Sequence, residues 1–235
     1  MVMVMVMATV MEMPSSSLRQ LGLEIGMRVF YRKFLKRFLD INVAIILGIL
    51  LSWLLIIVAI LVKLTSKGPI FFKQERFGLN SEPFTLYKFR SMADGAPVKA
   101  NSEFDDITSY ITPFGMFIRK TSIDELPQLV NIIKGDMSFI GPRPLASTDE
   151  KVLVLRKKNG ADQVRPGISG LAQVNGRNNI TDENKAAYDA KYASSLSMQL
   201  DILLIIETLI SVVNREGIFK TEQLVDLDKD AVKND

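Results

Sequence analysis

The sequence contains neither cysteine nor histidine among its 235 residues. Without cysteine it can form no disulfide, hold no zinc through thiolates and use no thiol nucleophile. Without histidine it lacks the usual general base and the usual ligand of transition metals. Any catalysis must therefore use Asp, Glu, Lys, Arg, Tyr, Ser or Thr. A metal partner would be a hard cation such as Mg²⁺, which prefers oxygen ligands.

A large excess of charge is also missing, because the formal net charge is only +3. This argues against nucleic acid as a partner, since nucleic-acid-binding domains are usually strongly basic. The chain is instead rich in hydrophobic residues, at 48%. Its length suits one sizeable domain, or one small domain with an additional element. The composition therefore points to a membrane segment.

The longest hydrophobic run, residues 41–62, reads INVAIILGILLSWLLIIVAILV and contains no charged residue. At roughly 22 residues it has the length of a helix that crosses a bilayer. Residues 28–40 before it place a phenylalanine at every fourth position and basic residues between them. That pattern is typical of a helix on an anionic membrane surface, and equally of a solvated helix that packs on protein. We interpret residues 1–27 as a poorly ordered tail.

Basic residues flank the hydrophobic run on both sides. The positive-inside rule draws both flanks toward the cytoplasm, which a single crossing cannot satisfy. A helix that enters, bends and returns can satisfy it, so we predict a re-entrant rather than a spanning helix. Gly48 and Ser52 are the candidate bending points, although neither forces a kink as proline would.

Beyond the membrane segment, two β-rich runs at 69–77 and 84–92 predict a hairpin with a turn near Gly78. Helices are predicted near 148–158 and 182–194, and a loop over 164–179. Residues 198–213 are apolar but carry Asp201 and Glu207, so they predict a core or interfacial helix rather than a second crossing.

The expected fold is α+β and mostly helical, with a membrane-embedded N-terminal helix followed by a compact catalytic domain with a small hairpin. The three expected regions are the tail at 1–27, the amphipathic and membrane helix at 28–67, and the catalytic domain at 68–235.

The stretch TSIDELPQLVNIIKGDMSFIGPRP, residues 121–144, combines two adjacent carboxylates with a helical pattern. We predict a helix that starts near Ser122 and ends before a Gly135 cap, since proline is tolerated in a first turn. Asp124 and Glu125 would then lie at its N-terminus, where the helix dipole favours negative charge. An ordinary capping box between Ser122 and Glu125 is the alternative.

Arginine recurs in rigid turns downstream. Arg143 lies between two prolines and Arg165 lies in a similar turn, and such an arginine can present its planar fork to a phosphate at little entropy cost. A glycine-punctuated loop adds Gln173, Asn175 and Arg177 as candidate polar contacts. Together with the carboxylates and the membrane segment, they predict a phosphorylated substrate at the bilayer surface, a carboxylate nucleophile or base, and Mg²⁺ masking phosphate charge.

Several of these blocks closely resemble the bacterial sugar transferases, the monotopic phosphoglycosyl transferases that initiate lipid-linked glycan and exopolysaccharide synthesis. The resemblance extends from about Lys36 to Val213 and is carried by KRFLD, FKQERFG, YKFRSM, IRKTSIDELPQLVNIIKGDMSFIGPRPL and VRPGISGLAQVNGR. Two departures stand out. Many members have Ser-Pro where this chain has Ser52-Trp53, and many have Trp at the position of Leu171.

The resemblance implies transfer of sugar-1-phosphate from a UDP-sugar to undecaprenyl phosphate, with release of UMP, at the cytoplasmic face of the bacterial membrane. It implies that Asp124 is the nucleophile and a Mg²⁺ ligand, and that Glu125 is its acidic partner. Basic family positions expected around phosphate or nucleotide are matched by Lys88, Arg90, Arg119, Arg143 and Arg177. The identity of the sugar is left open, and a homodimer is possible.

Three rival hypotheses remain at this point. The same transfer could proceed by direct displacement without an enzyme-bound intermediate. A membrane-anchored protein could bind a phosphorylated ligand without turning it over. A nucleic-acid-binding domain is the least compatible with the low net charge and the hydrophobic run.

Overall fold

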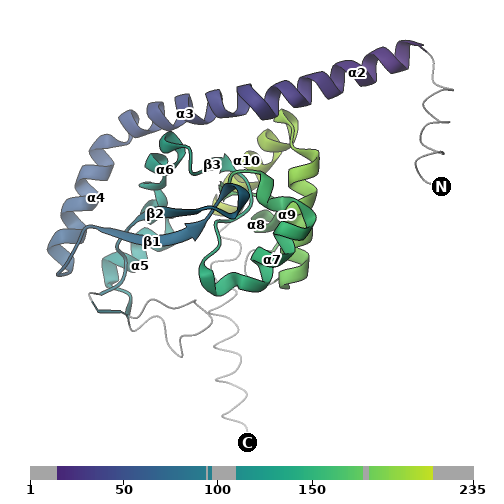
Figure 1. The fold of residues 1–235 in the computed structure, drawn as a ribbon. Helices are drawn as coiled ribbons and strands as arrows, with labels where there is room; N and C mark the ends of the chain where they lie inside the picture. The colour runs from purple at the N-terminus through teal and green to yellow at the C-terminus, as the bar shows by residue number, and fades with distance from the viewer. Residues whose placement is uncertain (1–14, 94, 97–109, 177–179, 214–235) are drawn as a thin grey trace, which may run out of the picture.

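The computed structural model describes residues 15–93, 95–96, 110–176 and 180–213 (Figure 1). Its N-terminal part is a long helical rod followed by a bend. The rod consists of α2 (Ser15–Phe30), the π-helical turn η1 (Tyr31–Leu35) and α3 (Lys36–Leu50). The tail predicted for 1–27 therefore extends too far, because residues from Ser15 onward are helical. Extending an existing helix costs less than nucleating one, which explains how this stretch of mixed polar and apolar residues continues α3 backward.

The bend lies at Leu51, whose backbone leaves the helical region with φ −95° and ψ 3°. The following helix α4 (Ser52–Thr65) departs by 65° from the axis of the helical stretch that ends at Leu50. Ser52, a predicted bending point, donates its hydroxyl to the carbonyl of Ile49 at 2.8 Å. Within the described residues no single helix is long and apolar enough to cross a membrane, whereas this bent pair together has that length and composition.

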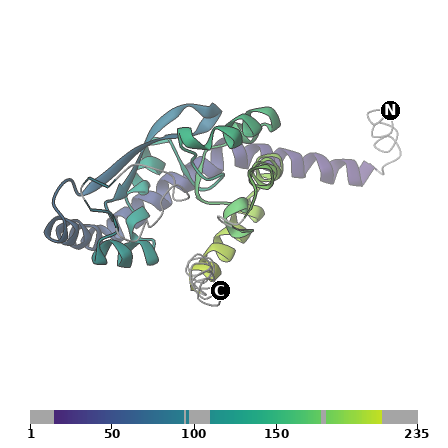
Figure 2. The same ribbon diagram turned by 90° about the horizontal axis from the view of Figure 1, so that it is seen from below.

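The rest of the described chain packs beneath the rod (Figures 1 and 2). Strands β1 (Phe71–Phe77) and β2 (Pro83–Phe89) form the predicted antiparallel hairpin, and β3 (Ser138–Ile140) pairs in parallel with β4 (Gly167–Ser169). The α-helices are α5 (Pro113–Lys120), α6 (Gln128–Lys134), α7 (Glu150–Asn159), α8 (Leu171–Val174), α9 (Asp182–Ser195) and α10 (Met198–Val213). Four 3-10 turns lie between these elements: η2 (Leu79–Ser81) in the hairpin, η5 (Ile123–Glu125) between α5 and α6, and η6 (Ser147–Asp149) and η7 (Ala161–Gln163) on either side of α7.

The hairpin, α7, α9 and α10 confirm the predicted elements. The loop predicted over 164–179 is wrong in part, because it contains β4 and α8. Each strand of the β3–β4 pair has only three residues, too short for alternation to be visible in sequence. These strands form because distant segments meet, with Ser138 opposite Gly167 and Ile140 opposite Ser169.

The hydrophobic core joins the helical rod and α4 to the elements that pack against them. Ala44 of α3, Leu86 of β2 and Ile132 of α6 lie in one buried cluster. A second cluster brings Val62 of α4 against Ile118 of α5. Both arms of the bent helix thus share buried side chains with the domain that carries the candidate site.

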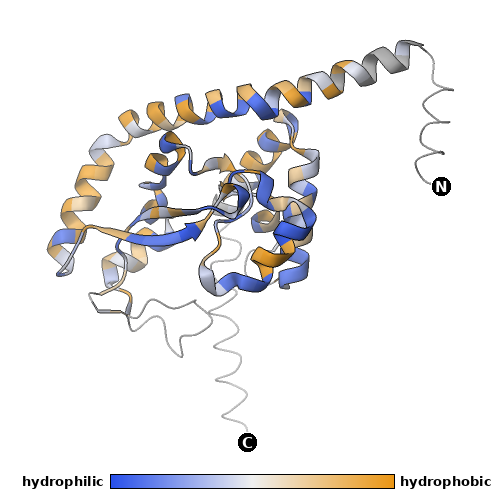
Figure 3. Cartoon of the chain, viewed as in Figure 1, coloured by the Kyte–Doolittle hydropathy of each residue, from blue (hydrophilic) through white to orange (hydrophobic). Residues whose placement is uncertain are grey.

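Two basic residues at the start of α3, in the middle of the rod, make contacts with protein. Lys36 forms an ion pair with Asp201 of α10 at 2.6 Å, and Arg37 donates to the carbonyl of Ile132 at 2.6 Å. On the outer side, Phe34 and Phe38 are 64% and 63% exposed. The contacts of Lys36 and Arg37 favour the interpretation that these two cations pack on protein. Figure 3 shows hydrophobic colour along much of α3 and α4.

Candidate active site

Asp124 and Glu125 lie in η5, the short turn between α5 and α6. Ser122, just before the turn, has the left-handed backbone conformation with φ 56° and makes no side-chain cap. The capping box, which was the alternative interpretation, is therefore absent. The helix start predicted near Ser122 is also wrong, because Asp124 and Glu125 lie in a separate 3-10 turn and α6 begins only at Gln128. The end of α6 matches the prediction, since Gly135 caps it with φ 105°.

Asp124 is 7% exposed, and this burial raises its pKa to about 6. The cations Lys88 and Arg119 oppose the increase by stabilising the carboxylate, while the neighbouring Glu125 adds to it. The carboxyl group therefore changes its charge near pH 6 and not near pH 4, and it is mostly ionised at pH 7. A cation or a substrate-bound metal beside it would favour the charged, nucleophilic form.

Lys88 connects the hairpin to the carboxylates. It extends from β2 and donates to Glu125 Oε1 at 2.6 Å. Arg119 approaches from α5, where its Nε donates to the hydroxyl of Ser91 at 2.8 Å. Burial lowers the pKa of Arg119, and the charge of Asp124 partly restores it. The structure thus brings four predicted site residues together from β2, α5 and η5.

Arg90, two residues after Lys88, connects two elements of the fold. Its Nη2 donates to the carbonyl of Ser66 at 2.8 Å, which joins the end of the hairpin to the end of α4. Its Nε and Nη1 are buried and have no hydrogen-bond partner among the described residues. Arg90 therefore retains donors that a ligand could use.

Arg143 lies in the arginine loop, which we define as Gly141–Leu145, directly after β3. Its side chain is exposed. Gly141 permits a close approach to the turn before β4, since an added Cβ there would collide with the carbonyl oxygen of Arg165. The loop therefore rests tightly on its neighbours while the Arg143 side chain points into solvent.

The hairpin relates the carboxylates to the arginine loop. Lys88 pairs with Phe72, and Phe84 pairs with Arg76, so Lys88 and Arg76 share the inner face of the sheet. Four residue steps along β1 separate the two pairs, or roughly 13 Å. Arg76 lies close enough to Arg143 for that charge to contribute to lowering its pKa, after the larger effect of burial. The inner face thus runs from Lys88, beside Glu125, to Arg76, beside Arg143.

The sequence analysis did not name Arg76. A signal was present, because Phe72, Gln74 and Arg76 occupy every second position of the strand and therefore share one face. Arg165 has a different local environment from the one the sequence suggested. Its Nε donates to the carbonyl of Gly135 at 2.9 Å, so it caps the end of α6 beside Arg37. Among the described residues its contacts are with the end of α6 and not with the carboxylates, and its phosphate role stays a prediction.

The glycine-punctuated loop is described only in part. The side-chain amide of Gln173 is buried and has no partner among the described residues. Asn175 is exposed and donates to the carbonyl of Leu171 at 2.8 Å. Arg177 lies outside the described residues. The structure brings neither Gln173 nor Asn175 into contact with the carboxylates.

The donor set fits Mg²⁺ only with help from a substrate. Among the described residues no group of three acidic side chains could hold a metal, and the site offers the pair Asp124 and Glu125. Mg²⁺ is commonly bound by one or two carboxylates together with substrate phosphates and water. The pair therefore suits a magnesium ion that arrives with, or is completed by, a diphosphate.

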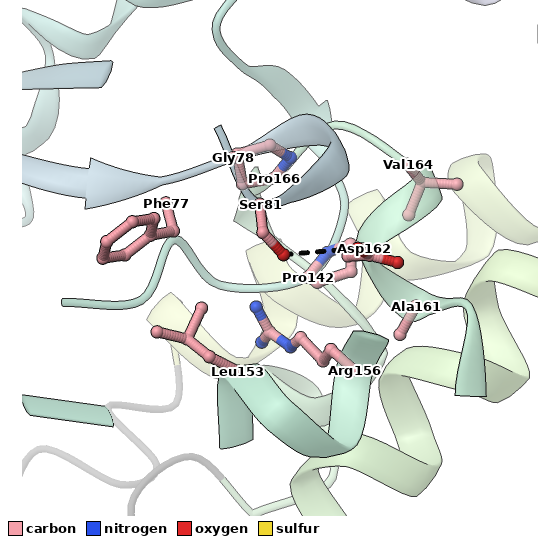
Figure 4. Close-up of a pocket in the computed structure, with 10 residues that line it drawn as sticks. All are labelled: Phe77, Gly78, Ser81, Pro142, Leu153, Arg156, Ala161, Asp162, Val164 and Pro166. Carbon is pink, nitrogen blue, oxygen red and sulfur yellow. Dashed lines mark hydrogen bonds between the residues drawn. The ribbon is translucent and has the colours of Figure 1, made fainter. Parts of the chain in front are cut away.

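A small pocket lies behind the arginine loop rather than at the carboxylates (Figure 4). Arg156 of α7 and Pro142 line it, together with Ser81, which donates to Asp162 at 3.2 Å. The two carboxylates are not among its lining residues. The carboxylate pair therefore lies outside this pocket.

Comparison with known proteins gives a consistent result. Residues 31–215 match the model of a family described as bacterial sugar transferase. The sugar transferase EpsL of Bacillus subtilis (strain 168), described as uncharacterised, is 45% identical over 164 residues, 70% of this chain and 80% of that protein.

Other relatives have named activities. A UDP-glucose:undecaprenyl-phosphate glucose-1-phosphate transferase of Escherichia coli (strain K12) is 36% identical over 157 residues, 64% of this chain and 34% of that protein. A UDP-N-acetylgalactosamine-undecaprenyl-phosphate N-acetylgalactosaminephosphotransferase of Aeromonas hydrophila is 38% identical over 167 residues, 68% of this chain and 39% of that protein. The chain spans about a third of the length of these two relatives.

Proposed function

The chain belongs to the bacterial sugar transferase family, and we propose that it transfers sugar-1-phosphate from a UDP-sugar to undecaprenyl phosphate, releasing UMP. The observation that carries this proposal is the buried Asp124, held between two cations and next to Glu125. An acidic pair of this kind can attack or orient a phosphoryl group, and the surrounding cations suit a diphosphate. The named activities of the relatives support the same substrate classes.

We propose a two-step reaction. A carboxylate oxygen of Asp124 attacks the phosphorus that bears the sugar, and the bond from that phosphorus to the bridging oxygen breaks. UMP leaves with that electron pair, and the phosphosugar remains on Asp124. A phosphate oxygen of undecaprenyl phosphate then attacks the same phosphorus and releases the carboxylate. When bound, Mg²⁺ held by Asp124 supplies charge masking on the diphosphate.

The pKa of Asp124 defines when the first step can occur. Only the ionised carboxylate is a nucleophile, so the rate is expected to fall as the pH falls through about 6. Lys88 and Arg119 lower this pKa and help to keep the group ionised near neutrality. Lys88 also pairs with Glu125, which limits repulsion between the two carboxylates.

The function is tested with a panel of UDP-sugars, undecaprenyl phosphate and Mg²⁺. The panel includes UDP-glucose and UDP-N-acetylgalactosamine, because the relatives' names differ in the sugar. Release of UMP with at least one donor supports the proposal, and chelation by EDTA should stop it until Mg²⁺ is restored. A protein that binds a UDP-sugar but releases no UMP would be the non-catalytic alternative.

We also propose that the bent pair α3–α4 is re-entrant in the bacterial cell membrane, with both ends in the cytoplasm, where the active site would face its soluble donor. The bend at Leu51 and the exposed apolar side chains of both helices support it. Transfer of the basic cluster at 28–37 to the outside would also cost about 1 kcal/mol per residue near an anionic surface.

The topology can be tested cleanly because the chain has no cysteine. Cysteines introduced singly at Ser16 and Ser81 are treated in intact cells with a membrane-impermeant maleimide. Both sites should be protected until the cells are lysed. Labelling of the Ser16→Cys variant alone from outside would mean that the helix crosses the membrane and that re-entrance is wrong.

A further inference from the structure

The backbone of the arginine loop is tied to two strands. The carbonyl of Pro142 accepts a hydrogen bond from the amide of Gly167 in β4 at 2.9 Å. The carbonyl of Leu145 accepts one from the amide of Phe77 in β1 at 2.8 Å. These contacts hold the loop on either side of its arginine.

The two carbonyls between them are held by guanidinium groups. The carbonyl of Arg143 accepts from Nη1 of Arg156 at 2.9 Å, and the carbonyl of Pro144 accepts from Nη1 of Arg76 at 3.4 Å. Four consecutive carbonyls thus have donors from β4, α7 and β1. The side chain of Arg143 remains exposed while its backbone is fixed.

Arg156 is itself firmly anchored. It is 5% exposed, and its Nε and Nη2 lie 2.8 and 2.6 Å from the same carboxylate oxygen of Asp189 in α9. Figure 4 shows its side chain extending from α7 into the pocket behind the loop. The guanidinium group therefore contacts two partners. Its Nε and Nη2 contact Asp189, and its Nη1 donates to the carbonyl of Arg143. A lysine side chain has a single nitrogen and cannot contact both partners with this geometry.

We propose that Arg156 is a positioning residue for Arg143, acting through the Arg143 carbonyl. The inference rests on the proposed function and on the role predicted for Arg143 from the sequence, which is to bind a phosphate of the UDP-sugar. A long exposed arginine loses conformational freedom when it binds, and this loss is smaller if its backbone is already immobile. Arg156 thereby sets the direction from which the Arg143 fork approaches the donor.

The competing interpretation is that Arg156 only joins α7 to α9. The chain offers a matched control for it, because Lys151 of α7 pairs with Glu183 of α9 at 2.7 Å on the surface. Lys151→Met removes an ion pair between the same two helices without touching the arginine loop. We expect this variant to keep wild-type kinetics.

The test is a double-mutant cycle between Arg156→Lys and Arg143→Ala, measured on the full-length protein with a UDP-sugar that it accepts. Arg156→Lys preserves the charge facing Asp189 but gives up the donor to Arg143. In the wild-type background we expect it to lower kcat/KM for the donor about tenfold. In the Arg143→Ala background we expect less than about a twofold further loss.

The kinetic pattern provides a second measurement. Arg156→Lys and Arg143→Ala should divide their losses between kcat and KM in the same proportion, since one acts through the other. Equal losses from Arg156→Lys in both backgrounds would overturn the proposal and leave a purely structural role. So would a loss of the same size from Lys151→Met.

A second variant covers the case in which Arg156→Lys does not fold. Arg76→Lys weakens the neighbouring hydrogen bond, which Arg76 donates to the carbonyl of Pro144. Arg76 is less buried than Arg156, and the lysine retains the positive charge. Its effect should likewise nearly disappear in the Arg143→Ala background. Independent effects of Arg76→Lys and Arg143→Ala would count against positioning through the loop backbone.

The controls separate this inference from the function on which it rests. Absence of UMP release by the wild type with every donor would remove the proposed function. Wild-type activity that Arg143→Ala does not reduce would remove the phosphate role of Arg143. An active enzyme that needs Arg143, combined with additive effects of Arg156→Lys, would overturn the positioning proposal alone.

Discussion

The carboxylate pair and the arginine loop hold their functional groups in opposite ways. At the carboxylates, side chains contact one another directly: Lys88 binds Glu125, and Asp124 is buried among charges. In the arginine loop the backbone is held and the Arg143 side chain is exposed. The comparison suggests that one region tunes protonation, whereas the other provides a rigid base for a group that must reach its ligand.

The largest effect is expected at Asp124. Asp124→Asn should reduce UMP release by at least about a thousandfold, because an amide cannot form the acyl phosphate that the two-step reaction requires. With labelled donor and no acceptor, the wild type should retain sugar phosphate and the variant should not. Transfer without any labelled enzyme in the wild type would favour direct displacement.

A stability measurement would distinguish loss of the nucleophile from loss of the fold in the Asp124→Asn variant. Because the folded pKa of Asp124 is raised from 3.8 to about 6, its contribution to stability is present below the unfolded pKa and is lost as the pH rises through about 6. At about 1.4 kcal/mol per unit, the ionised carboxylate costs roughly 2 to 3 kcal/mol at pH 7. Asp124→Asn should therefore unfold at a higher temperature than the wild type at pH 7, with little advantage at pH 4. A less stable variant at pH 7 would contradict the raised pKa.

An intermediate effect is expected in the arginine loop. Arg143→Ala should lower kcat/KM roughly tenfold to a hundredfold, in the range of one hydrogen-bonded charge. Arg143→Lys should not restore it, because a single ammonium cannot reproduce a planar fork held at a fixed base. Near-normal kinetics of the lysine variant would show that charge alone is sufficient there.

The smallest expected change is in the position of the acidic limb of the pH profile, which two variants should shift in opposite directions. Lys88→Met removes a cation that lowers the pKa of Asp124, so the acidic limb of kcat/KM should move to higher pH. Glu125→Gln removes a like charge, so the limb should move to lower pH even though the overall rate falls severely. Shifts in the same direction would show that Asp124 is not the group that titrates.

The sequence predicted the elements whose signals are local. The hairpin, α9 and α10 were recognised from alternation or helical periodicity, and Gly135 was recognised as a helix cap. The basic flanks favoured a bent helix over a straight one, and Gly48 and Ser52 were the candidate bending points. The bend lies at Leu51, next to Ser52. The short parallel pair β3–β4 was missed, because strands of three residues carry no periodic signal.

The candidate site shows the same division. Asp124, Glu125, Lys88 and Arg119 were named from the sequence, and the structure brings them together. Arg165 resembled Arg143 in its proline-flanked sequence, yet it caps α6 through Gly135. Two similar turns therefore have different environments, which sequence alone could not distinguish.

The amino-acid sequence by itself determined which chemistry is available: no thiol, no imidazole, a carboxylate pair, several arginines and a hydrophobic segment with basic flanks. Residue type sets these properties wherever the chain goes. Only the tertiary structure decided that burial raises the pKa of Asp124 and that Arg156 of α7 is joined to the carbonyl of Arg143. The physical reason is that desolvation and hydrogen bonding between distant segments depend on which surfaces meet, and this is specified by the packing of the whole chain.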